Sequence, residues 1–297
     1  MRGLLRVAAP RTAALVAVAG LAAGVAQADA GGVGLEPVGD RKPVGDRNPC
    51  AKPAIRKQRG LRCPDLAMSR PADIYPDTKH GVKILRATNS INNVGRGPAE
   101  LRGRRIGPRG MRARQQIHKR GGGVAKFHTG ARLYFKRIPG QGRYWKFHNA
   151  ARFELWSLDR DGRRKRLVTV GPKQDYCLRD LVHTFPGMSH SPSNPVYPSC
   201  SQDPRERHVT LGTSVGWSDV YPSSYHEQYV KLNRIRGRGC YSLAQIADPN
   251  DKLLELNEKN NAAAAIFYLT RRGGYRPGRC DHVRDRGLPP GRSYHPF

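Results

Sequence analysis

"VKILRATNSINNVG", residues 82–95, decides the fold class of this chain. Val82, Ile84 and Thr88 fall on every second position, with one interruption at Arg86. A period of two is typical of an extended strand with one buried face. The Asn-Asn pair and the glycine that close the stretch are typical of the end of a strand. The stretch therefore predicts a long β-strand.

Further segments on both sides of this stretch also favour strands. Asp161-Gly162 lies between two extended runs in "SLDRDGRRKRLVTV" (157–170), which is a strong hairpin signal. "NNAAAAIFYLT" (260–270) is ambiguous because its alanines favour helix and its end favours strand; we predict a strand. The other predicted strands are "GARLYFKRI" (130–138), "RFELWSL" (152–158), "RHVTLGTSVG" (207–216) and "GCYSLAQIADP" (239–249). Many short strands and no long amphipathic helix predict an all-β protein, a β-sandwich with its core in residues 63–270.

The two ends of the chain have a different composition. Arg2, Arg6 and Arg11 precede an apolar run over residues 13–26, and "AQADA" (26–30) offers a signal-peptidase site. Residues 1–30 therefore predict a secretory signal peptide; an uncleaved membrane anchor is the alternative, but the run is shorter than the roughly 20 residues of a membrane span. Residues 31–62, with the repeat "PVGDRKPVGDR", predict a Pro/Gly linker, and residues 271–297 a basic disordered tail.

The charge balance is strongly basic, with 53 Lys+Arg against 23 Asp+Glu. Such a charge favours acidic partners, for example the acidic polymers of a cell surface. The basic residues are spread along the chain, without helix-turn-helix or zinc-finger spacing, so we expect no specific nucleic-acid binding and no membrane-spanning segment in the mature chain. The predicted location is secreted, either extracellular or associated with the cell wall.

The six cysteines agree with export, because an even number in a secreted chain predicts disulfides. Spacing does not settle the connectivity. Proximity along the chain favours Cys50–Cys63 and Cys177–Cys200, which leaves Cys240–Cys280.

Several motifs follow one another in a specific order. They are "CPDL" (63–66), "ATNSINNVGRGPAELR" (87–102), "RFELWSL", "GPKQDYCLRD" (171–180), "GWSDVY" (216–221) and "DPNDKLLELNEKNN" (248–261). As an ordered set they resemble the lysyl oxidase family over about residues 63–270. The resemblance implies a β-sandwich of the lysyl oxidase catalytic-domain type, disulfide-bonded and with disordered termini.

The same resemblance implies an activity. The family oxidises the ε-amine of lysine side chains in proteins with copper and a lysine tyrosylquinone. By motif, the quinone would form from Lys173 and Tyr221. Its carbonyl would form a Schiff base with the substrate amine. A lysine-containing protein or another amine would then be the substrate.

The copper ligands are the point where this chain departs from the family. The family has a H-x-H-x-H run before the strand that matches "RFEL", and its three imidazoles converge from one face of an extended chain. Here Tyr144, Lys146 and His148 occupy those positions, so only His148 remains. The sequence therefore supports two functions: a copper amine oxidase, or a non-catalytic secreted β-sandwich that binds acidic cell-wall polymers or other proteins.

The resemblance also implies a calcium site. Its oxygen donors, of the kind that Ca²⁺ prefers, would come from the "CPDL" and "LELNEKNN" segments. The alternative is an Asx-rich turn in which Glu255 is solvated. The implied ligands are Asp65, the carbonyl of Leu66, Glu255, Asn257, Asn260 and Asn261.

Overall fold

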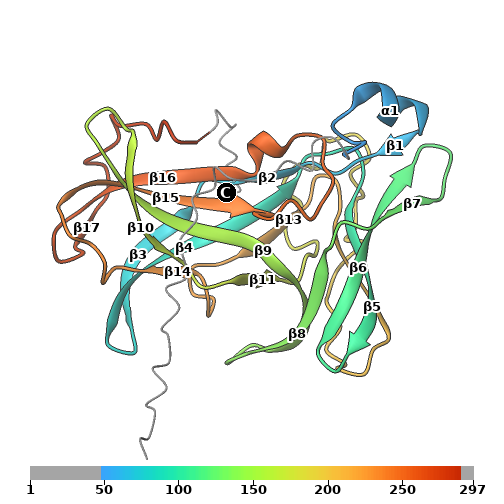
Figure 1. The fold of residues 1–297 in the computed structure, drawn as a ribbon, viewed down its shortest axis with the longest axis horizontal. Coiled ribbons are helices and arrows are strands. Elements are labelled where there is room, and N and C mark those ends of the chain that lie inside the picture. Colours follow the sequence, from blue (N-terminus) through green and yellow to red (C-terminus); the bar gives the residue numbers. More distant parts are fainter. Residues whose placement is uncertain (1–47, 289–297) are drawn as a thin grey trace, which may run out of the picture. The chain divides into compact units, whose positions relative to one another are not determined.

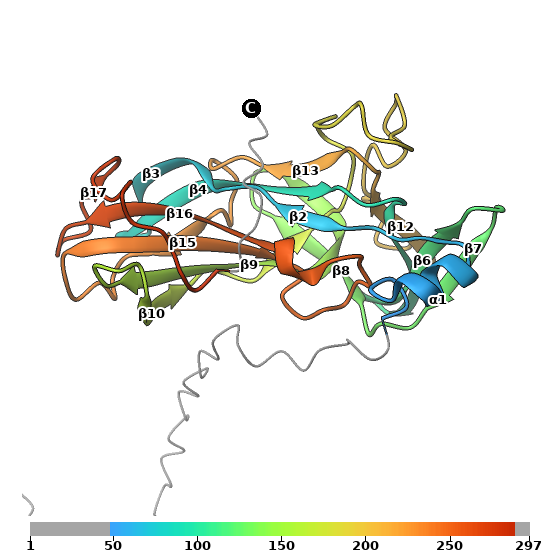
Figure 2. The same ribbon diagram turned by 90° about the horizontal axis from the view of Figure 1, so that it is seen from above.

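The computed structural model describes residues 48–288, and its strands form two antiparallel sheets. Figure 1 shows the elements, and Figure 2 shows β3 and β4 in one layer with β9, β15 and β16 in the other. One apolar cluster combines side chains of both layers, for example Leu85 of β4 with Trp145 and Phe153 of β9. The predicted all-β class is confirmed.

The smaller sheet has five strands and is built on β4 (Val82–Asn93), which confirms the strand predicted from "VKILRATNSINNVG". All four other strands pair with β4: β2 (Leu66–Met68), β3 (Ala72–Lys79), β13 (Ser218–Tyr221) and β14 (Tyr229–Lys231).

The larger sheet has twelve strands, and β9 (Gly142–Leu158) is its longest. Its main path runs β12 (His208–Thr213), β5 (Ala99–Gly107), β6 (Gly110–Lys119), β8 (Arg132–Ile138), β9, β15 (Gly239–Ala247), β16 (Ala262–Leu269) and β17 (Tyr275–Arg276). Off this path, β1 (Leu61–Arg62) and β7 (Val124–Phe127) pair with β6, whereas β10 (Arg164–Val170) and β11 (Gln174–Tyr176) pair with β9.

The predicted hairpin at Asp161-Gly162 is confirmed, because it joins β9 to β10. Gly162 has a φ of +78°, in the left-handed region that favours glycine. A Cβ at this position would also collide with the carbonyl oxygen of Arg284. The ambiguous stretch 260–270 contains β16, as predicted.

The asparagines at the end of β4 form hydrogen bonds that join this strand to other segments. Asn92 and Asn93 are buried. The Nδ2 of Asn93 donates to the carbonyl of Thr213 at 2.8 Å, and the Oδ1 of Asn92 accepts from Ser218 at 2.6 Å. Because buried amides need partners, these bonds fix β4 against segments distant in sequence.

The folded part is longer than predicted at both ends. Residues 48–62, assigned to the linker, hold the helix α1 (Pro53–Gln58), β1 and the buried Cys50. Residues 271–288, assigned to the tail, hold β17 and the buried Cys280. Disulfides explain both differences, since each cysteine ties a Pro/Gly-rich segment to the core. The predicted signal peptide and the outer parts of the linker and tail lie outside the described residues.

All three disulfides pair as proximity favoured. Cys50 bonds to Cys63, Cys177 to Cys200, and Cys240 to Cys280. The last bond spans 40 positions of sequence.

Candidate functional site

The middle of β9 is irregular, and this irregularity shapes the candidate site. Up to Phe147 the strand pairs with β8, and from Ala151 onward it pairs with β15. Across this gap β9 advances four positions while β11 advances two, so β9 carries a bulge of two extra residues. Asn149 in the bulge has a φ of +54°. Asp175 stabilises the bulge, because its Oδ1 lies 2.9 Å from both the Asn149 backbone nitrogen and the His148 Nδ1.

Lys146 lies just before the bulge and is buried, with 1% of its surface exposed. Its Nζ lies 3.4 Å from the hydroxyl of Tyr225 and 5.3 Å from the centre of that ring. The Tyr221 ring centre is 5.8 Å away. Burial lowers the pKa of Lys146 to about 8, although the charge of Glu227 opposes the shift. The side chain is therefore a cation held between tyrosine rings with little solvent.

Tyr221, at the end of β13, is the other buried member of this cluster. Its hydroxyl accepts a hydrogen bond of 2.8 Å from the backbone N–H of Cys177. Its ring stacks on Tyr176, with 3.8 Å between the ring centres. Burial raises the pKa of Tyr221 well above its ordinary value, so its hydroxyl keeps its proton at neutral pH.

A second lysine lies beside the cluster in a different electrostatic setting. Lys136 of β8 has its Nζ 2.8 Å from a carboxylate oxygen of Glu227 and 3.2 Å from one of Asp175. Burial lowers the pKa of Lys136, but the hydrogen bond and charge of Glu227, together with Asp175, raise it more, and the net shift is upward. Thus the acids stabilise Lys136, and Lys146 has no ion pair within 4.0 Å among the described residues.

The three positions of the expected copper run do not fit a copper ion. Tyr144 donates its hydroxyl to the carbonyl of Gln141 at 2.6 Å. Lys146 would place a cation beside a metal cation, and a Cu²⁺ ligand must offer an unprotonated donor atom. The Nδ1 of His148 lies 2.9 Å from Asp175, an arrangement that would leave Nε2 as the single imidazole donor of the run.

No hydrogen bond, ion pair or ring contact joins the two expected quinone residues, Lys173 and Tyr221, in the described part of the chain. Lys173 is exposed in the link between β10 and β11, and it takes part in none of the hydrogen bonds or ion pairs between described residues. Tyr221 is buried, and its lysine neighbour is Lys146. The signal that could have found Lys146 is its place at the centre of the "YWKFH" run, where a charged residue interrupts aromatic ones.

Most of the expected calcium residues form a second, buried or partly buried cluster, where β2 meets the segment before β16. Glu255 is fully buried and accepts hydrogen bonds of 2.5 Å from the backbone N–H of Leu66 and 2.9 Å from Asn261. Asp65 accepts a bond of 2.9 Å from the Nδ2 of Asn260. We call Asp65, Glu255, Glu258, Asn260 and Asn261 the acidic clasp.

Two details of the acidic clasp differ from what the resemblance implied. Asn257 is exposed, and its side chain caps the short 3-10 helix η3 (Glu258–Asn260) by accepting from the N–H of Lys259. Glu258 takes its place, since it accepts from Asn261 at 3.1 Å. Leu66 meets Glu255 through its N–H rather than its carbonyl. The alternative of a solvated Glu255 is wrong, because this side chain is fully buried.

The electrostatics of the acidic clasp favour an additional positive charge. Burial, and then the charge of Glu258, raise the pKa of Glu255 well above its ordinary value. Burial also raises the pKa of Asp65 to about 6, against the hydrogen bond from Asn260. The amide oxygens of Asn260 and Asn261 are buried without a hydrogen-bond partner. If the two amides turned over, the cluster would offer only oxygen donors, as Ca²⁺ prefers.

The fold and these clusters define a disulfide-bonded, mostly β protein with two antiparallel sheets. The chain matches no family model and no curated protein. None of the helices within residues 48–288 has the length and apolar character needed to cross a bilayer.

Proposed function

We propose that this chain is a secreted lysyl oxidase-like protein that acts by binding acidic cell-surface polymers and not by oxidising amines. The single observation that carries the proposal is the buried ammonium group of Lys146, at the second of the three positions where the family has copper ligands.

The charge state of Lys146 argues against copper. With a pKa of about 8, the amine is mostly protonated at neutral pH. A protonated amine has no lone pair for a metal, and it repels Cu²⁺ at short range. The two flanking positions do not compensate, because Tyr144 donates its hydroxyl to Gln141 and His148 could offer only one imidazole nitrogen, Nε2.

The surroundings of Tyr221 argue against a quinone. Its hydroxyl is bound to the backbone of Cys177, and its ring is covered by Tyr176. Lys173 is exposed, whereas the amine next to the Tyr221 ring belongs to Lys146. The ring is thus in a packed environment typical of a structural tyrosine.

Binding is supported by the charge and by the disulfides. The net charge of the chain is +30, which favours association with polyanions. Three disulfides around one core are typical of exported proteins, which meet such polymers outside the cell.

The test is metal analysis of the full exported protein after incubation with excess Cu²⁺ in air and dialysis. We expect far less than one copper per chain, no quinone absorbance, no peroxide with a lysine-rich protein, and retention on an immobilised acidic polysaccharide. The double variant Tyr144→His with Lys146→His is the matched control and should bind more copper. Stoichiometric copper in the unaltered protein, or a peptide with Lys173 joined to Tyr221, would overturn the proposal.

A calcium ion at the acidic clasp is a further part of the proposal. Two raised carboxyl pKa values and two unpartnered amide oxygens support it. Such an ion would join β2 to the segment before β16 and stabilise the binding fold.

A further inference from the structure

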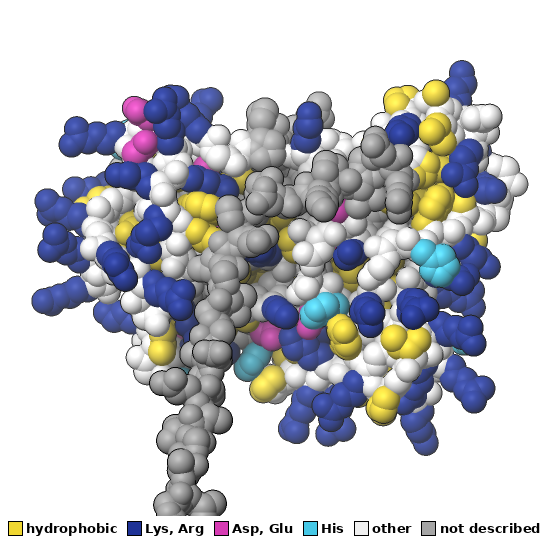
Figure 3. Space-filling model, in the orientation of Figure 1, with side chains coloured by type: hydrophobic (Ala, Val, Ile, Leu, Met, Phe, Trp, Pro, Cys, Tyr) yellow, Lys and Arg dark blue, Asp and Glu magenta, His cyan; other side chains and the backbone are white. Residues whose placement is uncertain are grey.

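The outer face of the β12–β5–β6–β8 part of the large sheet carries an ordered set of arginines. On β5, Arg102 and Arg104 are exposed. Leu101, which precedes Arg102, and Gly103, which lies between the two arginines, are buried. On β6, Arg112 and Arg114 alternate in the same way with buried apolar residues. Figure 3 shows Lys and Arg side chains over both ends of the molecule, including this one.

The strand register places these arginines directly opposite one another. Arg102 pairs with Arg114, and Arg104 pairs with Arg112. The Arg104–Arg112 pair is extended on both sides. Arg104 also pairs with His208 of β12, and Arg112 also pairs with Arg132 of β8. Directly paired residues share a face of the sheet, so four basic side chains form one row across four strands. We call Arg102, Arg104, Arg112, Arg114 and Arg132 the arginine rows.

Like charges in direct cross-strand pairs destabilise a sheet, so their repetition needs an explanation. Surface arginines are usually interspersed with acids, but no carboxylate lines the groove of about 540 Å³ in which four of the five arginines lie with Lys126 and His128. The nearest acid along the strand, Glu100, is engaged by His118 and Tyr197 at 2.9 and 2.7 Å and interacts with Arg102 only through its charge. None of the five arginines forms a hydrogen bond or ion pair through its side chain with the described residues.

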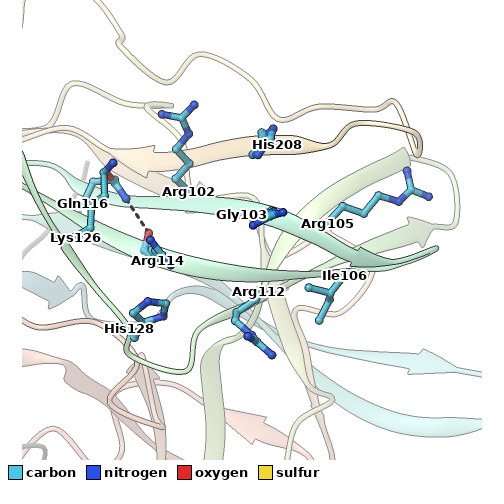
Figure 4. A pocket seen from close by; sticks show the side chains of 11 residues that line it. Arg102, Gly103, Arg105, Ile106, Arg112, Arg114, Gln116, Lys126, His128 and His208 are labelled. Carbon is cyan, nitrogen blue, oxygen red and sulfur yellow. Dashed lines mark hydrogen bonds between the residues drawn. The ribbon is translucent and has the colours of Figure 1, made fainter.

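Figure 4 shows how the side chains lie in this groove. Arg102 and Arg112 extend in different directions from the two strands, as mutually repelling cations on flexible stems do. Arg105 differs from them, because its guanidinium donates to the carbonyls of Gly107, Pro108 and Pro204 and so has a structural role. The arginine rows are thus the part of this face that is free to bind.

We propose that the arginine rows bind a linear acidic polysaccharide. Neighbours in a row are about 5 Å apart across strands, and successive rows about 7 Å apart along a strand, so a chain with a charge on each short repeat can meet several guanidinium groups in turn. Guanidinium groups bind carboxylate and sulfate in bidentate geometry. No Phe, Tyr or Trp side chain lines the groove, which argues against single-stranded nucleic acid, where base stacking on such rings is a main contribution.

This inference deepens the proposed function and rests on it, so its test must separate the site from the function. The probes are heparin fragments, which are sulfated, polygalacturonate, which is carboxylated, and oligothymidylate of matched charge. Binding to the full protein is measured by titration calorimetry at low and at physiological ionic strength. The variant Arg104→Gln with Arg112→Gln removes the central pair. The matched control is Arg160→Gln with Arg163→Gln, two exposed arginines at the β9–β10 turn.

We expect the central-pair variant to bind the polysaccharides about 5-fold or more weakly at low salt, since each lost guanidinium removes a charge-assisted contact. The control removes the same charge and should lose less than about 2-fold. The melting temperature of the unaltered protein should rise more with polysaccharide than that of the central-pair variant.

Each contrary outcome has its own meaning. If the unaltered protein binds none of the probes, the proposed function fails together with this site. If both double variants weaken binding equally, the affinity depends on net charge and not on the arginine rows, and only the site is overturned. If oligothymidylate binds as tightly as heparin, the ligand is a nucleic acid and the assignment to polysaccharide is overturned.

Discussion

The Nζ of Lys146 lies 5.8 Å from the centre of the Tyr221 ring, and both side chains are buried. A cation above an aromatic ring is attracted by about 0.5–2 kcal/mol. This attraction offsets only part of the cost of burial, because the net pKa of Lys146 still falls to about 8. The burial of the Lys146 charge therefore lowers the free energy of unfolding, and the rest of the fold holds the two side chains in place.

Replacing Lys146 by methionine should stabilise the protein at pH 7. The folded-state pKa of about 8 lies below the usual 10.5, so the penalty is fully present below pH 8 and is relieved as pH rises toward 10.5. Removing the charge should raise the free energy of unfolding by up to about 3 kcal/mol at pH 7. The gain over the unaltered protein should shrink between pH 8 and 10.5, as measured by denaturant unfolding.

Lys136→Met is the matched control for that experiment. Lys136 has two carboxylate partners, and its pKa is raised. Its removal leaves Glu227 and Asp175 without that cation and should lower stability. Equal effects of the two lysine variants would contradict the electrostatic account of Lys146.

Tyr221→Phe should lower stability, because we assign the residue a structural role. The variant removes the hydroxyl that accepts from the N–H of Cys177 and leaves that buried donor unpaired. The expected loss is about 1–3 kcal/mol in the free energy of unfolding. A variant as stable as the unaltered protein would show that the Cys177 N–H finds another partner.

Asp65→Asn tests the acidic clasp. The raised pKa of about 6 means that Asp65 contributes stability below about pH 4, and that this contribution is lost as pH rises through 6. In the presence of a chelator, the variant should be more stable than the unaltered protein at pH 7 and should lack this decline. Millimolar Ca²⁺ should reverse the order at pH 7 if the clasp binds the ion. Thermal unfolding from pH 3.5 to 7.5 measures both effects, and identical pH profiles would contradict the assignment.

Removal of the disulfides should follow the lengths of the loops that they close. The Cys240–Cys280 bond closes a loop of 40 positions and the Cys50–Cys63 bond one of 13. In the chain-entropy model these are worth about 4 and about 3 kcal/mol. Serine pairs at each site, compared by denaturant unfolding, should differ in this order. A larger loss for Cys50–Cys63 would show that native contacts of the N-terminal segment outweigh loop entropy.

The strands with alternating apolar residues could be predicted from the sequence, and β5 and β6 could not. Their inward positions include Gly103 and Ala113, which carry little apolar signal, while their outward positions are arginines. A strand pattern with small residues inside and cations outside reads like a polar loop. The arginine rows depend on strand register, which a single sequence does not specify.

The candidate site was predicted only in part, for a related reason. Spacing on β9 placed Tyr144, Lys146 and His148 together, and the structure keeps them on one strand. Spacing could not show that Lys146 is buried or that Asp175 holds His148, since both follow from the bulge at Asn149 and from β11. Similarly, the motif that named Asn257 could not show that Glu258 and not Asn257 faces the clasp.

The change of partner along β9 sets the order in which the protein can open. Before the bulge β9 is hydrogen-bonded to β8, and after it to β15, while β10 and β11 pair with its other edge. None of the strands β8, β10, β11 and β15 can therefore detach from the sheet without breaking hydrogen bonds to β9. Backbone amide protons of Phe153 and Leu155 should consequently exchange with deuterated water only through global unfolding, whereas those around Asn149 should exchange through local fluctuations.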